Sequence, residues 1–331
     1  MSAATPAVER APRSAQVRRV FREQPVIPLI GLLVILVAVL LAVQPGILNR
    51  PFGWANGIVY FAVPLAILAA SQTLTMLTGG IDLSVATTAS MAAYVMATQA
   101  PSQGDATAIV IALVLAALVG LMNGIGVGIF RVQPLIMTLA TGLVVLGGAN
   151  VYQKLVITAG SRVPEPVATI GSGTSFGFFP NTLFVFIPIA LLIMLILKRT
   201  GYGRMLYAVG DNAVAARLAG VRVWQVLLVL YVLSGLLAGV GGIILAGAAK
   251  TATLNAADAY LLPSIAAAVI GGTSIFGGRG GYAGTIVGAL ILRVLLGLLG
   301  ALNTPEPIRQ IVYGGIILVV AAAYARVTEE G

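Results

Sequence analysis

One carboxylate stands between two strongly apolar segments, in the stretch Leu77-Thr78-Gly79-Gly80-Ile81-Asp82-Leu83-Ser84-Val85. A charged side chain at membrane depth is costly, and proteins that keep one there usually use it. The two glycines before it allow a sharp backbone turn, and Asp82 is placed to cap the helix that follows. The chemistry open to Asp82 is therefore helix capping at a gate, direct contact with solute hydroxyls, or proton transfer.

Uncharged polar residues add to this carboxylate. Gln72 and Thr75 lie three residues apart on one face of the preceding helix, where they either line a polar path or bond a neighbouring helix. Asn123 has the same two interpretations. A second glycine pair, Gly271-Gly272, is followed by Thr273 and Ser274 and weakly echoes the first stretch. The candidate residues for a solute path or gate are Gln72, Thr75, Asp82, Ser84, Asn123, Thr273 and Ser274.

The chain lacks the residues of the common enzyme sites. It contains no histidine and no cysteine, which removes the usual metal ligands and proton shuttle. The phosphate-binding pattern G-x-x-x-x-G-K-[ST] and the patterns H-E-x-x-H and G-x-S-x-G are also missing. We therefore predict no catalytic residue, no metal site and no cofactor on this chain, and no nucleotide bound by it.

The composition indicates an all-α polytopic membrane protein. Of its 331 residues, 59% are hydrophobic and 9% are charged, and the mean hydropathy is +1.03. A soluble domain has about 25% charged residues. The net charge of +9 is explained by Lys and Arg in cytoplasmic loops, so it does not indicate nucleic-acid binding.

The apolar runs predict about ten membrane spans with both termini cytoplasmic. A basic tail at 1–25 precedes a single transmembrane domain at 26–331. The positive-inside rule places the basic loop 199–222 in the cytoplasm and the stretch 149–181 outside. The expected spans are 26–43, 57–77, 83–98, 107–128, 133–148, 183–198, 224–246, 261–274, 283–300 and 308–325.

Three features of this topology have open interpretations. The 261–274 span is short enough to be a broken or re-entrant helix. The stretch 149–181 is a lid, a docking surface or a plain linker. Arg293, inside the ninth span, is expected to reach a subunit interface or a carbonyl. The span count also places Asp82 at the cytoplasmic end of a helix break, where acidic or histidine partners are missing, so a proton relay is disfavoured.

The loop 199–222 predicts a compact cytoplasmic helix flanked by glycines. Asp211 or Asn212 can cap it and Gly220 can end it. A helix of this kind either docks into a groove on a partner or rests on lipid headgroups.

Three stretches in order resemble the permease subunits of bacterial ABC importers for monosaccharides of the ribose, xylose and galactofuranose type. They are GGIDLSV at 79–85, YAVGDNAVAARLAGVRV at 207–223 and SIAAAVIGGTSIFGGRGGYAGTIVGALIL at 264–292. The resemblance runs from about residue 57 to the C-terminus. Asp211 stands where the family commonly has glycine, an acid usual near Ala213 or Val214 is missing, and Ala86 replaces a usual glycine.

The resemblance implies a transport subunit that performs no covalent chemistry. It implies two ATP-binding subunits that carry ATP and Mg, a second permease subunit and a periplasmic sugar-binding protein, in the bacterial inner membrane among its lipids. The 204–220 segment then corresponds to the helix that couples to the ATPase. Its matching residues include Arg204, Tyr207, Gly210, Asn212, Ala215, Arg217 and Gly220.

The sequence therefore predicts an ATP-driven permease that moves a monosaccharide by alternating access. One alternative is the same machine with a nucleoside or a branched-chain amino acid as cargo. Another is an ion-coupled secondary transporter, which is disfavoured because acidic residues within the spans are nearly absent.

Overall fold

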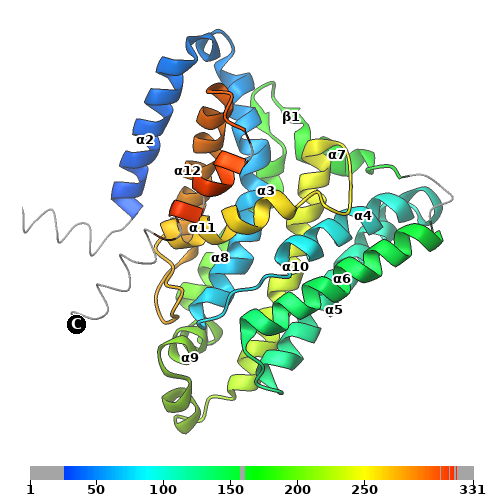
Figure 1. Ribbon diagram of the computed structural model, residues 1–331, viewed down its shortest axis with the longest axis vertical. Helices are drawn as coiled ribbons and strands as arrows, with labels where there is room; N and C mark the ends of the chain where they lie inside the picture. Colours follow the sequence, from blue (N-terminus) through cyan, green and yellow to red (C-terminus); the bar gives the residue numbers. More distant parts are fainter. Residues whose placement is uncertain (1–25, 157–160, 306, 313, 317, 319–331) are drawn as a thin grey trace, which may run out of the picture.

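The computed structural model describes residues 26–156, 161–305, 307–312, 314–316 and 318, and it is almost entirely helical there (Figure 1). The expected basic tail at 1–25 lies outside the described residues, as does half of the expected span 308–325. The long helices are α2 (Val26–Val43), α3 (Pro51–Leu77), α4 (Val85–Gln103), α5 (Asp105–Gly128), α6 (Pro134–Val156), α8 (Thr182–Arg199), α9 (Gly201–Leu218), α10 (Val223–Ala249) and α12 (Tyr282–Ala301). The shorter elements are α7 (Glu165–Ser172), α11 (Leu261–Ile270), the 3-10 helices η1 (Pro45–Asn49) and η2 (Asp258–Tyr260), and the strands β1 (Thr174–Ser175) and β2 (Phe179–Pro180).

Seven helices in the described part are long and apolar enough to cross a membrane: α2, α3, α5, α6, α8, α10 and α12. The prediction of an all-α polytopic membrane protein is therefore confirmed. The count of ten spans and the cytoplasmic position of both termini stay predictions. Two expected spans take a different form, and both lie deep in the protein.

The expected span 83–98 is α4, which is long enough to cross but is rich in Ala, Thr and Ser. It is surrounded by protein over most of its length, so its surface need not be as apolar as one that faces lipid. The expected span 261–274 is α11, which has ten residues. Ten residues of helix are about 15 Å long, half of a bilayer core of roughly 30 Å, so the prediction that this segment is short is confirmed.

Close packing of α10 against α5 and α3 forms the centre of the fold. One side of α5 carries a small residue at every fourth position, Ala112, Ala116, Gly120, Gly124 and Gly128. A β-carbon added to Gly120 would lie 2.2 Å from the Tyr231 carbonyl oxygen on α10, and one on Gly235 would lie 2.3 Å from the Ala116 carbonyl oxygen. These two backbones touch, as small residues allow in membrane proteins.

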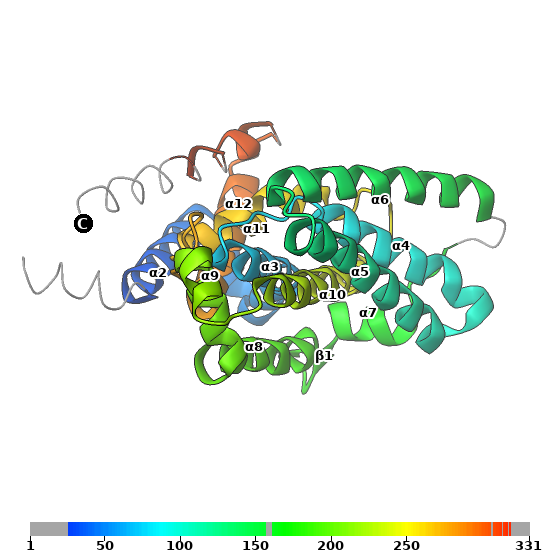
Figure 2. The same ribbon diagram turned by 90° about the horizontal axis from the view of Figure 1, so that it is seen from below.

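The other helices lie on both sides of α10 and at the two ends of the molecule. In Figure 1, α4, α5 and α6 lie together on one side of α10, and α2 and α12 lie on the other side. Figure 2 shows α6 and α8 on opposite faces, with α3 and α10 between them. Helix α9 lies at one end of the molecule, and α7 with the β1–β2 hairpin lies toward the other end (Figure 1).

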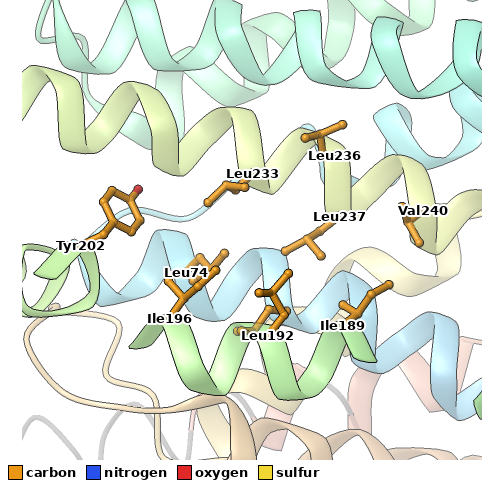
Figure 3. A pocket seen from close by; sticks show the side chains of 10 residues that line it. Leu74, Ile189, Leu192, Ile196, Tyr202, Leu233, Leu236, Leu237 and Val240 are labelled. Carbon is orange, nitrogen blue, oxygen red and sulfur yellow. The ribbon is translucent and has the colours of Figure 1, made fainter. Parts of the chain in front are cut away.

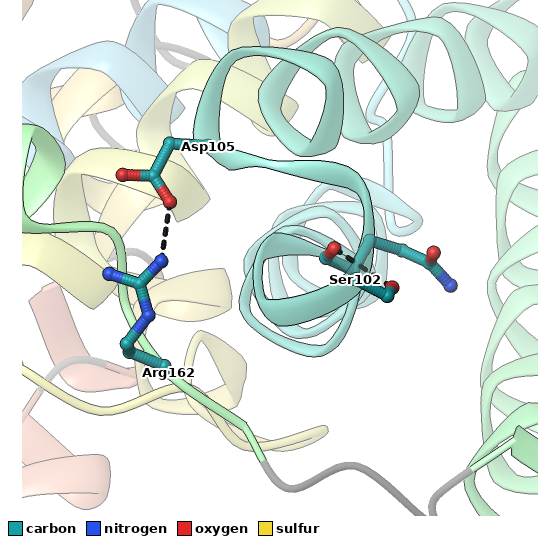
Figure 4. Close-up of polar contacts among 4 residues, drawn as sticks. Ser102, Asp105 and Arg162 are labelled. Atoms are coloured by element: carbon teal, nitrogen blue, oxygen red, sulfur yellow. Dashed lines mark hydrogen bonds and ion pairs between the residues drawn. The ribbon is translucent and has the colours of Figure 1, made fainter.

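The stretch 149–181 is structured over the part that is described, so it is not a plain linker. It contains the end of α6, α7 and the antiparallel pair in which Thr174 opposes Pro180. Helix α7 packs so closely on α10 that a β-carbon on Gly171 would lie 2.3 Å from the Gly247 carbonyl carbon. An exposed ion pair, Arg162 to Asp105 at 2.7 Å, joins this stretch to the start of α5, near a local Ser102–Gln99 hydrogen bond (Figure 4).

Arg293 lies on α12 with its guanidinium carbon 4.9 Å from the centre of the Phe61 ring on α3. A cation over an aromatic face is stabilised by the ring quadrupole. This residue therefore contributes to the packing of α12 on α3 within one chain.

A glycine-to-alanine pair tests the central contact. Gly120→Ala inserts a methyl group against the backbone of α10, and overpacking of this kind costs about 2 kcal/mol. We expect the purified protein to lose its monodisperse peak at a lower temperature in size-exclusion chromatography. Gly147→Ala on α6, where nothing lies within 4 Å, is the matched control and should leave that temperature unchanged or higher. Equal behaviour of the two variants would contradict the close contact.

Candidate functional site

The segment between α3 and α4 brings a carboxylate into the interior. Helix α3 ends at Leu77 and α4 begins at Val85, and the backbone N–H of Gly80 closes the end of α3 by donating to the Thr75 carbonyl at 3.0 Å. Gly79 has φ +76°, a left-handed conformation that other residues rarely adopt. The chain then runs through residues 80–82 without helical structure.

The carboxylate of Asp82 accepts three hydrogen bonds, and the residue is 2% exposed. The Ser84 backbone N–H donates to Oδ1 at 3.0 Å, and the Ser84 hydroxyl donates to the same oxygen at 2.6 Å. The hydroxyl of Ser234 on α10 donates to Oδ2 at 2.7 Å. Hydrogen bonds to a charged acceptor are shorter and stronger than those between neutral groups, so this arrangement suits an ionised carboxylate.

Two chains of donors converge on this carboxylate. Ser71 on α3 lies 2.7 Å from Ser234, and Asn123 on α5 donates from Nδ2 to the Ser84 hydroxyl oxygen at 2.8 Å. If the carboxylate is ionised, Ser234 must donate to it, so Ser71 donates to Ser234. The carboxylate therefore sets the direction of hydrogen bonds from α3, α5 and α10.

The backbone around Asp82 is also held. Gln72 on α3 donates to the Asp82 carbonyl at 2.8 Å and accepts from its N–H at 3.3 Å. Thr138 on α6 accepts from the Leu83 N–H at 3.0 Å and donates to the Ile81 carbonyl at 3.2 Å. Four helices thus hold the segment 81–84.

Two expectations about Asp82 are wrong in detail. The residue before α4 is Ser84, so Asp82 is not the N-cap of that helix; it bonds the N–H two residues ahead, as in an Asx turn. Its contact with Ser234, near the middle of α10, also places it level with the middle of that span, not at the end. The non-helical segment 80–82 accounts for both differences, because it delays the start of α4.

The structure brings together four of the seven candidate path residues: Gln72, Asp82, Ser84 and Asn123. Thr75 bonds the carbonyls of its own helix, Ser71 at 3.2 Å and Gln72 at 3.1 Å, so it does not join the group. Thr273 and Ser274 lie in the separate turn after α11, where the Ser274 hydroxyl accepts from the Phe276 N–H at 3.1 Å.

Sequence reasoning missed Ser71, Thr138 and Ser234. Each is a small hydroxyl residue in an apolar helix, and such residues commonly bond their own helix backbone, as Thr75 does here. Two further polar atoms of this region, Asn123 Oδ1 and the Tyr231 hydroxyl, are buried without a protein partner. The site therefore combines one satisfied carboxylate with neutral hydrogen-bonding groups.

Helix α9 consists of two helices joined at Asn212, whose φ of −154° and ψ of 100° are not helical. The Asn212 Oδ1 accepts from the N–H groups of Val214 at 3.0 Å and Ala215 at 2.9 Å, so Asn212 caps the second helix, as the sequence predicts. Gly220, with φ +87°, follows the end of that helix.

The two parts of α9 present different surfaces. In the second part, Val214 is 65% exposed and Leu218 is 86% exposed, next to exposed Arg217 and Ala215. Arg204 is also exposed. Tyr207 and Gly210 in the first part are half-buried and contact this same chain. The predicted coupling residues therefore do not share one surface.

A cavity of about 150 Å³ lies between α8 and α10, and it is lined almost entirely by aliphatic side chains such as Leu192, Ile196 and Leu237 (Figure 3). Tyr202 closes one end, and its hydroxyl donates to the Val226 carbonyl at 3.0 Å. A cavity without hydrogen-bonding groups does not suit a polyol. Within the described residues, His, Cys, Asp and Glu form no group that could hold a metal ion.

Comparison with known proteins shows a family whose model matches most of the sequence. Residues 54–321 match the family described as branched-chain amino acid transport system, permease component. No solved structure matches the chain.

Curated relatives cover most of the chain. The galactofuranose transporter permease protein YtfT of Escherichia coli is 36% identical over 278 residues, which is 82% of this chain and 80% of the relative. The ribose import permease protein RbsC of Bacillus subtilis is 33% identical over 311 residues, 90% of this chain and 92% of the relative. The fructose import permease protein FrcC of Rhizobium meliloti is 33% identical over 267 residues, 78% and 74% respectively.

The convergence of donors on Asp82 predicts the effect of Asp82→Asn. The amide nitrogen cannot accept from the Ser234 hydroxyl, so the hydrogen bond from Ser234 to a charged acceptor is lost even if the hydroxyl turns to accept from the amide. A hydrogen bond to a charged group contributes about 2 kcal/mol. We expect a lower midpoint of thermal unfolding for the purified protein. Thr75→Val, a buried change on α3 that removes only bonds within the helix, is the control and should shift the midpoint far less. A larger effect at Thr75 would contradict the central role of Asp82.

Proposed function

The chain belongs to this family of permease components, and from that premise we propose that it carries a monosaccharide across the bacterial inner membrane in an ATP-driven importer. It is a transport subunit and not an enzyme. Sequence similarity to permeases named for galactofuranose, ribose and fructose over most of the chain is the observation that carries the proposal.

The proposal includes partners that supply energy and specificity. Two ATP-binding subunits hold ATP and Mg, a periplasmic binding protein delivers the sugar, and a second permease subunit, identical or related, completes the membrane part. About ten membrane helices with both termini cytoplasmic place α9 on the ATPase side. In this arrangement α4 and α11 are the internal helices.

The chemistry of the interior supports an uncharged solute. Asp82 is the one charged side chain among the fully buried residues that the structure describes, and its oxygens already accept three hydrogen bonds. The remaining buried polar groups of the site are hydroxyls and amides, which match the hydroxyls of a sugar. A zwitterionic amino acid would need charged or dipolar partners for both of its ends.

The family description gives a second candidate cargo, a branched-chain amino acid. A nucleoside is the third candidate cargo. A thermal-shift screen of the cognate binding protein against pentoses, hexoses, nucleosides and leucine separates the three. We expect stabilisation by one sugar, and stabilisation by leucine alone would replace the sugar proposal.

Uptake into vesicles tests the energy source. The vesicles contain the permease and its ATPase subunits, and the loaded binding protein is supplied from outside. They should import the solute only when ATP is enclosed in the vesicles, on the side of the ATPase subunits. Protonophores and sodium ionophores should leave the rate unchanged. Uptake that continues without ATP and collapses with an ionophore would establish an ion-coupled carrier.

The exposed apolar pair on the second part of α9 is the proposed ATPase contact. Val214 and Leu218 lie four residues apart on one helix face, and Arg217 lies beside them. Interface centres are apolar with charged groups at the rim, and a buried carboxylate at the centre is costly.

Leu218→Asp should therefore reduce recovery of the ATPase subunit with the tagged permease by at least about tenfold, which corresponds to roughly 1.4 kcal/mol. Leu302→Asp is the control, because Leu302 is also a largely exposed leucine (57%) but follows α12 and is not part of α9. Both variants should reach the membrane in equal amounts. If Leu218→Asp recovers as much ATPase subunit as the wild type, the ATPase contact lies elsewhere on the permease.

A further inference from the structure

The first part of α9 covers a hydrogen bond between two glycine-rich turns. The Gly278 N–H donates to the Leu77 carbonyl at 3.0 Å, which joins the turn after α11 to the end of α3. Gly210 lies directly on this bond. A β-carbon there would be 1.8 Å from the Leu77 oxygen and 2.6 Å from the Gly278 nitrogen, so no larger residue fits without a shift.

A side chain makes a second link between α9 and the same turn. The Tyr207 hydroxyl donates to the Gly280 carbonyl at 2.9 Å. Burial raises the pKa of this hydroxyl, so it stays protonated and able to donate. Tyr207 and Gly210 lie three residues apart and therefore face the turn together.

The two turns also touch each other directly. A β-carbon on Gly277 would lie 2.7 Å from the Gly210 carbonyl oxygen and 3.0 Å from the Gly79 nitrogen. Gly79, Gly277 and Gly278 have φ values of +76°, +92° and +71°, which only glycine adopts readily. Three segments far apart in sequence thus meet backbone to backbone.

This contact is continuous with the Asp82 site. Four residues separate Leu77 from Asp82, and the Gly80 position between them is packed against the Tyr231 hydroxyl and Pro134, at 2.9 and 3.1 Å from an added β-carbon. A displacement of the end of α3 would therefore also displace the segment 81–84. On the other side, Gly210 lies two residues before the Asn212 cap of the exposed second part of α9.

We propose that the first part of α9 links ATPase movement to the Asp82 segment by moving as one body with both glycine turns, and that Tyr207 is a positioning residue for coupled transport. The inference rests on the proposed function. It also assigns Tyr207 and Gly210 to contacts within the permease, in place of contacts with the ATPase.

Tyr207→Phe tests the hydroxyl link with minimal change in packing. In the assembled complex we expect ATPase binding and ATP hydrolysis to remain, while the amount of solute imported per ATP falls roughly threefold, the size expected for loss of one buried hydrogen bond. Tyr202→Phe is the matched control, because its hydroxyl lies on the same helix but bonds the Val226 carbonyl on α10. It should keep the wild-type ratio. Equal ratios in the two variants would overturn the assignment of Tyr207.

A cysteine pair tests movement as one body. The natural chain has no cysteine, and a β-carbon on Gly278 would lie 3.4 Å from the Asp211 β-carbon, close to the 3.5–4.5 Å typical of disulfides. With Asp211→Cys and Gly278→Cys, oxidation should leave uptake within about twofold of the reduced protein. Uptake that is abolished by oxidation and restored by reductant would show that α9 and the turn move apart. Gly278→Cys alone controls for strain at its positive φ.

The same measurements separate the two levels of proposal. If the wild-type complex shows no ATP-dependent uptake, the proposed function fails. If the wild type transports and Tyr207→Phe transports equally well per ATP, only the transmission role fails.

Discussion

The buried carboxylate of Asp82 is the constraint on which the interior of this permease depends. A charge removed from water must be met by donors, and here they come from α10, from Ser84 and, one bond further, from α3 and α5. In its ionised form the carboxylate only accepts hydrogen bonds, so each neighbouring hydroxyl has to donate to it. Its burial therefore fixes the relative position of three helices and of the non-helical segment that carries it.

Small residues make that arrangement sterically feasible. The hydroxyl of Ser234 has little reach, so α10 must come close to the segment 81–84 and to α3. The glycines at the α5–α10 crossing let the backbones touch and bring Asn123 within 2.8 Å of Ser84. Larger residues at Gly120 or Gly235 would separate α5 from α10 and displace Ser234 and Asn123 from their positions around the carboxylate.

Helix α9 shows how one motif can serve two surfaces. The break at Asn212 turns the apolar pair Val214 and Leu218 outward, while Tyr207 and Gly210 face the two glycine turns. In the proposed importer the outer part meets the ATPase and the inner part carries the displacement to the Asp82 segment. Both parts lie in the stretch that the sequence resemblance assigned to coupling, although only the outer part suits a contact with a partner.

The sequence by itself determined the class of the protein. Apolar runs and scarce charges indicate a polytopic helical membrane protein, and the three ordered stretches at 79–85, 207–223 and 264–292 carry the resemblance to a permease. It also identified Asp82, Ser84, Gln72 and Asn123, since polar residues among apolar ones are conspicuous. It did not distinguish Ser71 and Ser234 from Thr75, because each is a small hydroxyl in a helix and only its neighbour across the interface decides its partner. Nor did it show that α4 begins only at Val85, two residues after the expected start, or that Gly210 faces inward. Those features arise from contacts between residues more than 60 positions apart, such as Leu77 with Gly210 and Asp82 with Ser234, and only the tertiary structure brings such residues together.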